Sequence, residues 1–173
     1  MNRMRKVLIA DDEVKVGQLV KRLIQWDRLG LTCIGLVTDG QTAYEKILSE
    51  SPDIVITDIR MPVLTGLEMI QKASEQGVKC HFIVVSGYKY FDYAQKALKY
   101  GVEDYLLKPI DEDELNRQLQ KIVAEEEQRE DKQQQVDQIE KKLEDSKYLR
   151  HKEFLRQIPV SYTHLTLPTK LEV

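Results

Sequence analysis

The chain has 173 residues, of which 42% are hydrophobic and 32% charged, and its formal net charge is −3. This size fits one globular domain with an appendage, and the small negative charge gives no general reason to expect nucleic-acid binding. No apolar run approaches the roughly 20 residues of a membrane helix, and no signal-peptide core is present. Cys33 and Cys80 lie in apolar, strand-like runs, so we expect reduced core residues of a cytoplasmic protein.

Strand and helix patterns alternate along the N-terminal part of the chain. Five short runs rich in aliphatic and β-branched residues predict strands at 6–10, 31–37, 54–56, 82–85 and 104–108. Apolar residues at helical spacing follow each of the first four runs. The first helix carries Val16, Leu19 and Leu23, and we expect it to end at Gly30. Strands alternating with helices predict an α/β fold, in which helices cover both faces of a parallel sheet.

Polar residues stand at the carboxyl ends of four of these strands: Asp11 and Asp12, Asp58, Ser86, and Lys108. In an open parallel sheet these ends share one edge, where ligands bind. Grouped carboxylates need a cation, and Mg²⁺ suits a few carboxylates together with water and phosphate. A lysine and a hydroxyl at the same edge can bind phosphoryl oxygens. Each residue alone has an ordinary explanation, such as a turn cap for Asp58, but four agreeing strand ends predict one site.

The region 111–158 contains no glycine or proline and is rich in Gln, Glu and Lys, which predicts a long helix. Apolar residues hold heptad core positions at its start and again at Val136 and Leu143, but Glu126, Arg129 and Gln133 hold the core positions between them. An interrupted seam predicts weak or switchable pairing of two helices. The alternative is a solvated helical linker.

The C-terminal stretch differs again, since residues 160–169 are uncharged and rich in threonine. They can be encoded by GTC TCT TAT ACA CAT CTG ACG CTG CCG ACG, which looks like read-through into a transposase-type sequencing adapter. We therefore expect residues 159–173 to be a non-native tail that has no designed place in the core.

Residues 3 to about 122 resemble the receiver domain of two-component response regulators. The motifs that carry the resemblance are Asp-Asp-Glu at 11–13, the strand 53–58 with the loop residues Met61, Pro62 and Gly66, Val-Val-Ser-Gly at 84–87, and Asp-Tyr-Leu-Leu-Lys-Pro at 104–109. The resemblance implies a flavodoxin-like, doubly wound (βα)5 fold with a five-stranded parallel sheet in the order 2-1-3-4-5. We expect a receiver domain at 3–122, a helical linker or weak coiled coil at 123–158, and the tail at 159–173.

The resemblance also implies how phosphate and metal are bound. Asp58 would be the phosphoacceptor, taking a phosphoryl group from a phosphohistidine of a sensor histidine kinase. Asp12, Asp58 and the backbone carbonyl of Arg60 would hold Mg²⁺, with Asp11 assisting. Because the receiver modifies only itself, we do not expect an enzyme in the ordinary sense.

Other positions would respond to the phosphoryl group or control its lifetime. Lys108 and Ser86 would bind phosphoryl oxygens, and Ser86 and Tyr105 would act as the switch that changes the face formed by the fourth helix, the fifth strand and the fifth helix. Arg60 and Tyr88 occupy the two positions that tune reaction rates in this family. Tyr88 could shield the acyl phosphate from water, or it could be a partly buried surface aromatic.

The stretches 86–94 and 100–105, and the Leu-Arg-His-Lys-Glu-Phe-Leu run at 149–155, resemble a narrower group of regulators that carry an arabinose-regulator-type helix-turn-helix output. No basic helix-turn-helix pattern is present in these residues, so DNA would be bound only through a missing C-terminal module. We expect a phosphorylation-activated transcription regulator that forms a phosphorylation-dependent homodimer. The alternative is a stand-alone receiver that acts in a phosphorelay or by protein–protein binding.

Overall fold

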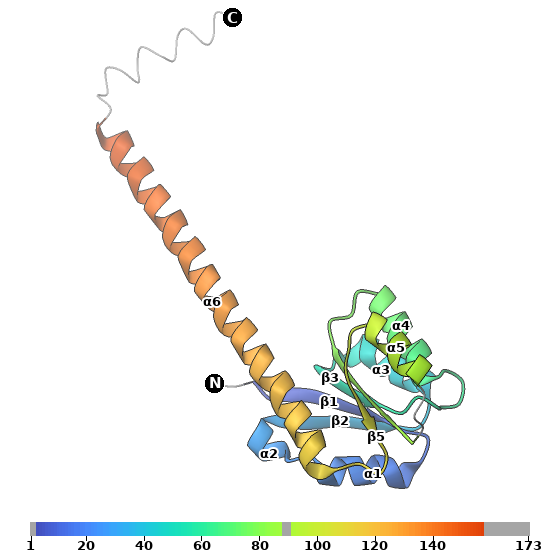
Figure 1. Ribbon diagram of the computed structural model, residues 1–173. Helices are drawn as coiled ribbons and strands as arrows, with labels where there is room; N and C mark the ends of the chain where they lie inside the picture. Colours follow the sequence, from blue (N-terminus) through green and yellow to red (C-terminus); the bar gives the residue numbers. More distant parts are fainter. Residues whose placement is uncertain (1–2, 88–90, 158–173) are drawn as a thin grey trace, which may run out of the picture. The chain divides into compact units, whose positions relative to one another are not determined.

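The computed structural model describes residues 3–87 and 91–157 (Figure 1). Its strands are β1 (Arg5–Ala10), β2 (Leu31–Val37), β3 (Ile54–Thr57), β4 (His81–Ser86) and β5 (Val102–Leu107). All neighbouring strands run parallel, in the order β2-β1-β3-β4-β5. This confirms the expected flavodoxin-like order, in which the chain reverses its winding direction beside β1 and β3.

The helices that connect the strands are α1 (Val14–Leu23), α2 (Trp26–Leu29), α3 (Gly40–Glu50), α4 (Gly66–Glu75) and α5 (Phe91–Lys99), and α6 (Glu112–Gln157) follows β5. Helices α3, α4 and α5 lie on one side of the sheet, and α1 and α2 lie on the other (Figure 1). The sheet is therefore covered on both faces, which explains why its central strands are continuous apolar runs.

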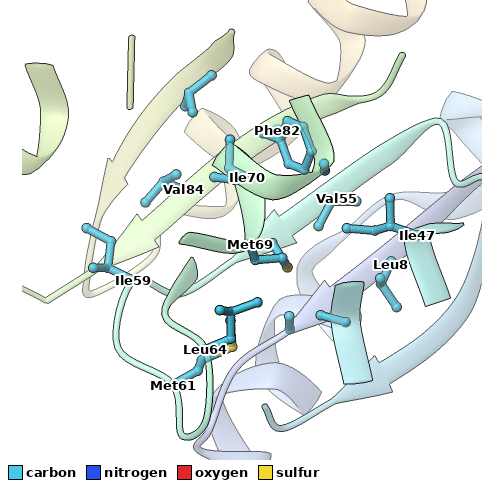
Figure 2. Packing of buried hydrophobic residues seen from close by; sticks show 14 of the residues in the cluster. Leu8, Ile47, Val55, Ile59, Met61, Leu64, Met69, Ile70, Phe82 and Val84 are labelled. Carbon is cyan, nitrogen blue, oxygen red and sulfur yellow. The ribbon is translucent and has the colours of Figure 1, made fainter. Parts of the chain in front are cut away.

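Successive strand residues point to opposite faces, so each face has its own core. Figure 2 shows one of them, where Leu8 of β1 and Val55 of β3 pack with Ile47 of α3 and with Met69 and Ile70 of α4. All five side chains are at most 1% exposed. Burying an aliphatic side chain of this size contributes about 1.5–3 kcal/mol, so this layer fixes α3 and α4 against the sheet.

The opposite core contains Val7 and Ile9 of β1 together with Val20 of α1. Leu115 and Leu119, from the first turns of α6, complete it and are both 0% exposed. The beginning of the long C-terminal helix is thus part of the core of the α/β domain, which accounts for the apolar heptad positions at its start.

The expected first helix is wrong at its C-terminal end. It ends at Leu23, and Ile24 adopts an extended conformation before the short helix α2 begins. The side chain of Asn116 causes the break, because its Nδ2 donates to the Leu23 carbonyl at 2.8 Å and its Oδ1 accepts from the Gln25 N–H at 2.9 Å. Gly30, in the left-handed conformation with φ +64°, ends α2 instead.

The fifth strand also differs from its expected bounds, since it begins at Val102 rather than at residue 104. The β4–β5 register shifts between Phe82 and Ile83, so the extra residue Glu103 bulges from the ladder and its carboxylate lies 2.7 Å from His81 Nδ1. A bulge of this kind adds a residue that an alternating pattern does not show.

The chain divides into two compact units, residues 1–124 and 125–173. In the second unit, residues 125–157 continue α6, and several apolar side chains on it are exposed, among them Val136 (46%), Ile139 (58%) and Leu143 (54%). No helix among the described residues is both long enough and apolar enough to cross a membrane. The expected tail at 159–173 lies outside the described residues, and so does Tyr88, which is expected to tune the reaction rate. The boundaries at 122 and 158 stay predictions.

Candidate functional site

Backbone hydrogen bonds continue the sheet just beyond its strands and bring the polar residues to one edge. The N–H of Asp11 donates to the Val37 carbonyl at 3.0 Å, and the N–H of Asp58 donates to the Ala10 carbonyl at 2.9 Å. The N–H of Lys108 donates to the Ser86 carbonyl at 2.9 Å. Each side chain therefore leaves a rigid strand end rather than a free loop, which is the placement that a precise site requires.

Three carboxylates meet at this edge. Asp11, Asp12 and Asp58 each offer one oxygen, and these oxygens lie within 4.8 Å of one another. Asp11 and Asp58 are 3% and 7% exposed, whereas Asp12 is exposed. Hard oxygen ligands at this separation, one of them on an exposed residue, suit a divalent cation that keeps some of its water. The predicted acidic cluster is thus brought together.

Lys108 joins two of these carboxylates. Its Nζ lies 3.1 Å from Asp11 Oδ2 and 3.2 Å from Asp58 Oδ2. Burial by itself lowers the pKa of the Lys108 ammonium, but the Asp11 hydrogen bond and the negative charges of Asp58 and Asp11 outweigh it, so the pKa is raised. Lys108 is therefore a fixed cation that neutralises part of the cluster.

Asp11 shows the cost of burying a carboxylate next to another one. Burial raises its pKa above the usual value, and the negative charge of Asp58 acts in the same direction. Hydrogen bonds from the Glu13 N–H, at 2.9 Å, and from Lys108 oppose the shift without cancelling it. A further cation near Asp11 would therefore stabilise its ionised form.

The loop between β3 and α4 folds tightly over the backbone of Asp58. The Gly66 N–H donates to the Ile59 carbonyl at 2.8 Å. A Cβ atom at Gly66 would lie 2.0 Å from the Asp58 carbonyl oxygen, and one at Gly40 would lie 1.9 Å from the Leu64 carbonyl oxygen. Only glycine fits at either contact. The sequence indicated Gly66 merely as a loop residue and did not reveal the contact at Gly40.

The remaining predicted residues, Ser86, Tyr105 and Arg60, lie in different environments. Ser86, the last residue of β4, is 2% exposed and lies at the same edge as Asp58. Tyr105 pairs with Val84 two residues before the end of β5 and packs against the core of α3, α4 and α5. Arg60 has an exposed side chain two residues past Asp58. The roles assigned to these residues stay predictions.

Comparison with known proteins agrees with this architecture. The family model of the response regulator receiver domain matches residues 7–120. The chain is 46% identical over 122 residues to the uncharacterized transcriptional regulatory protein YesN of Bacillus subtilis, covering 70% of this chain and 33% of YesN. It is 35% identical over 120 residues to the transcriptional regulatory protein HptR of Staphylococcus aureus, covering 69% of this chain and 47% of HptR.

Among solved structures, the receiver domain of AraT, a response regulator from Geobacillus stearothermophilus, is 36% identical with a TM-score of 0.69. The match covers 73% of this chain and 98% of that domain. The chain spans between a third and a half of the length of the curated relatives, so the likeness is confined to one of their domains. On the family match, the shared strand order and the acidic strand-end cluster, the chain belongs to the response regulator receiver domain family.

Proposed function

We propose that Asp58 accepts a phosphoryl group from a phosphohistidine of a sensor histidine kinase. The observation that carries this proposal is the meeting of three carboxylates within 4.8 Å, two of them contacted by Lys108. An oxygen of the Asp58 carboxylate forms the new O–P bond, the P–N bond breaks, and the imidazole leaves with the electron pair. In phosphoryl transfer of this kind, catalysis comes mainly from positioning and charge neutralisation.

Mg²⁺ fits the donor set and would neutralise charge on the transferring phosphoryl group. Asp12, Asp58 and the backbone carbonyl of Arg60 would hold it, with Asp11 assisting. The raised pKa of Asp11 supports this assignment, because a carboxyl group that is costly to ionise is relieved by a nearby cation. Lys108 would exchange its contact with Asp58 for a phosphoryl oxygen, since both oxygens occupy the same region.

Phosphorylation would be read through Ser86 and Tyr105. The Ser86 hydroxyl would bind a second phosphoryl oxygen and Tyr105 would follow it inward, which biases a two-state rearrangement of α5, β5 and the start of α6. Arg60 and Tyr88 would tune the lifetime of the acyl phosphate. Replacing Ser86 with Ala should leave phosphorylation possible but weaken the phosphate-dependent NMR shifts on this face. Unchanged shifts would contradict the switch role.

The output is proposed to be transcription control. YesN and HptR are named as transcriptional regulatory proteins and are longer than the matched region. DNA would be bound by a module outside these 173 residues, and the cytoplasm, where this family works, would be the compartment shared with the kinase. A stand-alone receiver that acts in a phosphorelay or by protein–protein binding remains the second candidate, and the exposed apolar residues of α6 are compatible with it.

Intact-mass analysis tests the central proposal. Wild-type protein incubated with acetyl phosphate and Mg²⁺ should gain one phosphoryl group, and EDTA should prevent the gain. Asp58→Asn should show no gain, whereas Asp113→Asn, which changes an exposed carboxylate in the first turn of α6, should behave as wild type. Equal labelling of the wild type and Asp58→Asn would remove Asp58 from its role.

A further inference from the structure

Thr57, the last residue of β3, directly precedes the proposed phosphoacceptor and is 1% exposed. Its hydroxyl donates a hydrogen bond to the backbone carbonyl oxygen of Asp58 at 2.9 Å. A buried threonine in a strand is often a β-branched space-filler. Here, however, the hydroxyl is engaged with the residue that performs the chemistry, so we propose that Thr57 is a positioning residue for Asp58.

The Thr57 hydroxyl acts on the Asp58 carboxylate through the peptide group that joins Asp58 to Ile59. The carbonyl of Asp58 and the N–H of Ile59 belong to the same planar trans peptide and point in opposite directions. The Ile59 N–H donates to Asp58 Oδ1 at 2.7 Å. A hydroxyl that fixes the carbonyl therefore also fixes the N–H that holds the carboxylate.

The other side of this peptide is fixed by packing. The backbone of Gly66 lies so close to the Asp58 carbonyl that a Cβ there would stand 2.0 Å from the oxygen. The same Cβ would be 3.1 Å from Thr57 Oγ1, so glycine and hydroxyl approach the carbonyl together. The peptide is thus held by one hydrogen bond and one steric contact.

The two carboxylate oxygens of Asp58 are consequently distinguished before any phosphodonor arrives. Oδ1 is held by the Ile59 N–H, and Oδ2 lies 3.2 Å from Lys108 Nζ. Holding a nucleophile in one orientation lowers the barrier of a positioning-controlled reaction. This inference rests on the proposed phosphorylation of Asp58 and adds a residue to its machinery.

The test separates the hydroxyl from the methyl group of Thr57. Thr57→Val keeps the shape and loses the hydroxyl, whereas Thr57→Ser keeps the hydroxyl and loses the methyl group. Phosphorylation by acetyl phosphate at saturating Mg²⁺ should have a maximal rate about three- to tenfold lower in Thr57→Val, which corresponds to one neutral hydrogen bond. Thr57→Ser should keep most of the rate but melt at a lower temperature. Thr32→Val, the same exchange in β2, should keep the wild-type rate.

An unchanged maximal rate in Thr57→Val would overturn the proposal, as would rates that follow the melting temperatures of the variants. If Thr57→Val does not fold, Thr57→Ser and Thr57→Ala provide the same comparison, because they differ only by the hydroxyl. Amide exchange at Ile59 should be faster whenever the hydroxyl is absent. If the wild type itself is not phosphorylated, the proposed function fails instead.

Discussion

Lys108 Nζ lies 3.2 Å from Asp58 Oδ2, although 50 positions separate the two residues in the chain. The contact exists because β3 and β5 both pair with β4 and end at the same edge. The lysine pairs with two carboxylates while phosphate is absent, and in the proposed function it would pair with the phosphoryl group afterwards. The pairing with carboxylates is measurable without any phosphodonor.

Replacing Lys108 with Met should destabilise the protein by about 1–3 kcal/mol, because buried Asp11 and Asp58 lose their shared cation. Urea unfolding without divalent cations would measure the change. Adding Mg²⁺ should recover part of the loss, since the added cation takes over the neutralisation. A variant as stable as wild type without Mg²⁺ would show that the lysine does not neutralise the cluster.

Asp11→Asn should stabilise the metal-free protein at neutral pH, because it removes a buried carboxylate that is costly to ionise. The pKa of Asp11 is raised in the folded protein, first by burial, so its contribution to stability is present below the usual value of 3.8 and is lost as pH rises through the folded-state pKa. The difference in unfolding free energy between Asp11→Asn and the wild type should therefore shrink as pH falls toward 3.8. Unfolding free energies of both proteins between pH 3 and pH 7 would check the sign, and a pH-independent difference would contradict it.

The fold and the acidic site follow from short-range signals, and the misses share a physical cause. The strands and the positions of Asp11, Asp58 and Lys108 could be predicted because each strand end is marked by a local change from apolar to polar residues. The strand order came from the resemblance to receiver domains. The break after Leu23 depends on Asn116, which is 93 positions away and satisfies the backbone groups there. No local pattern contains that partner.

The role inferred for Thr57 could not be predicted for a related reason. In the sequence Thr57 is one more β-branched residue of a strand, and its hydroxyl acquires meaning only when the Asp58 carbonyl is placed against Gly66. The signal that could have drawn attention to it is a hydroxyl residue directly before the acceptor, Thr57, together with a glycine later in the same loop, Gly66. The significance of these two residues becomes clear only when the fold of the loop is known.

Val63→Gly should stabilise the protein by about 0.5–1 kcal/mol. Val63 adopts φ +69° and is 82% exposed, a left-handed conformation that is strained for a β-branched residue. Glycine relieves the strain, and its greater freedom in the unfolded chain offsets part of the gain. Thermal melting measures the effect. The matched change Val14→Gly, at an exposed position of α1, should lower stability, and a similar loss in both variants would contradict the strain argument.

Deleting residues 160–173 should leave the melting temperature and Asp58 phosphorylation unchanged. The reason is the abrupt change of composition after the long helix, together with the likeness of one possible set of codons for residues 160–169 to a library adapter. Amplifying and sequencing the genomic DNA across this junction provides the independent measurement. An in-frame match to the tail, or a substantial loss of stability on deletion, would show that the segment is native.

The homodimer should assemble weakly through α6 and strengthen on phosphorylation. Val136, Ile139 and Leu143 are exposed at a spacing that places them on one side of the helix. Their apolar surface spans little more than one heptad, and charged or polar residues hold core positions on the N-terminal side of it. A seam this short supports only marginal pairing of two helices. A second contact, made when the receiver is phosphorylated, should therefore shift the equilibrium from monomer to dimer.

Sedimentation velocity should therefore show mainly monomer without phosphodonor and more dimer with acetyl phosphate and Mg²⁺. Ile139→Glu should reduce the phosphorylation-dependent dimer at least about tenfold in association constant, since it places like charges from the two helices on the apolar stripe of Val136, Ile139 and Leu143. Gln134→Glu adds the same charge on the opposite side of the helix and should have little effect. Equal loss in both variants would mean that net charge, rather than the apolar stripe, controls assembly. A tight dimer without phosphate would mean that α6 alone is sufficient and that phosphorylation regulates something else.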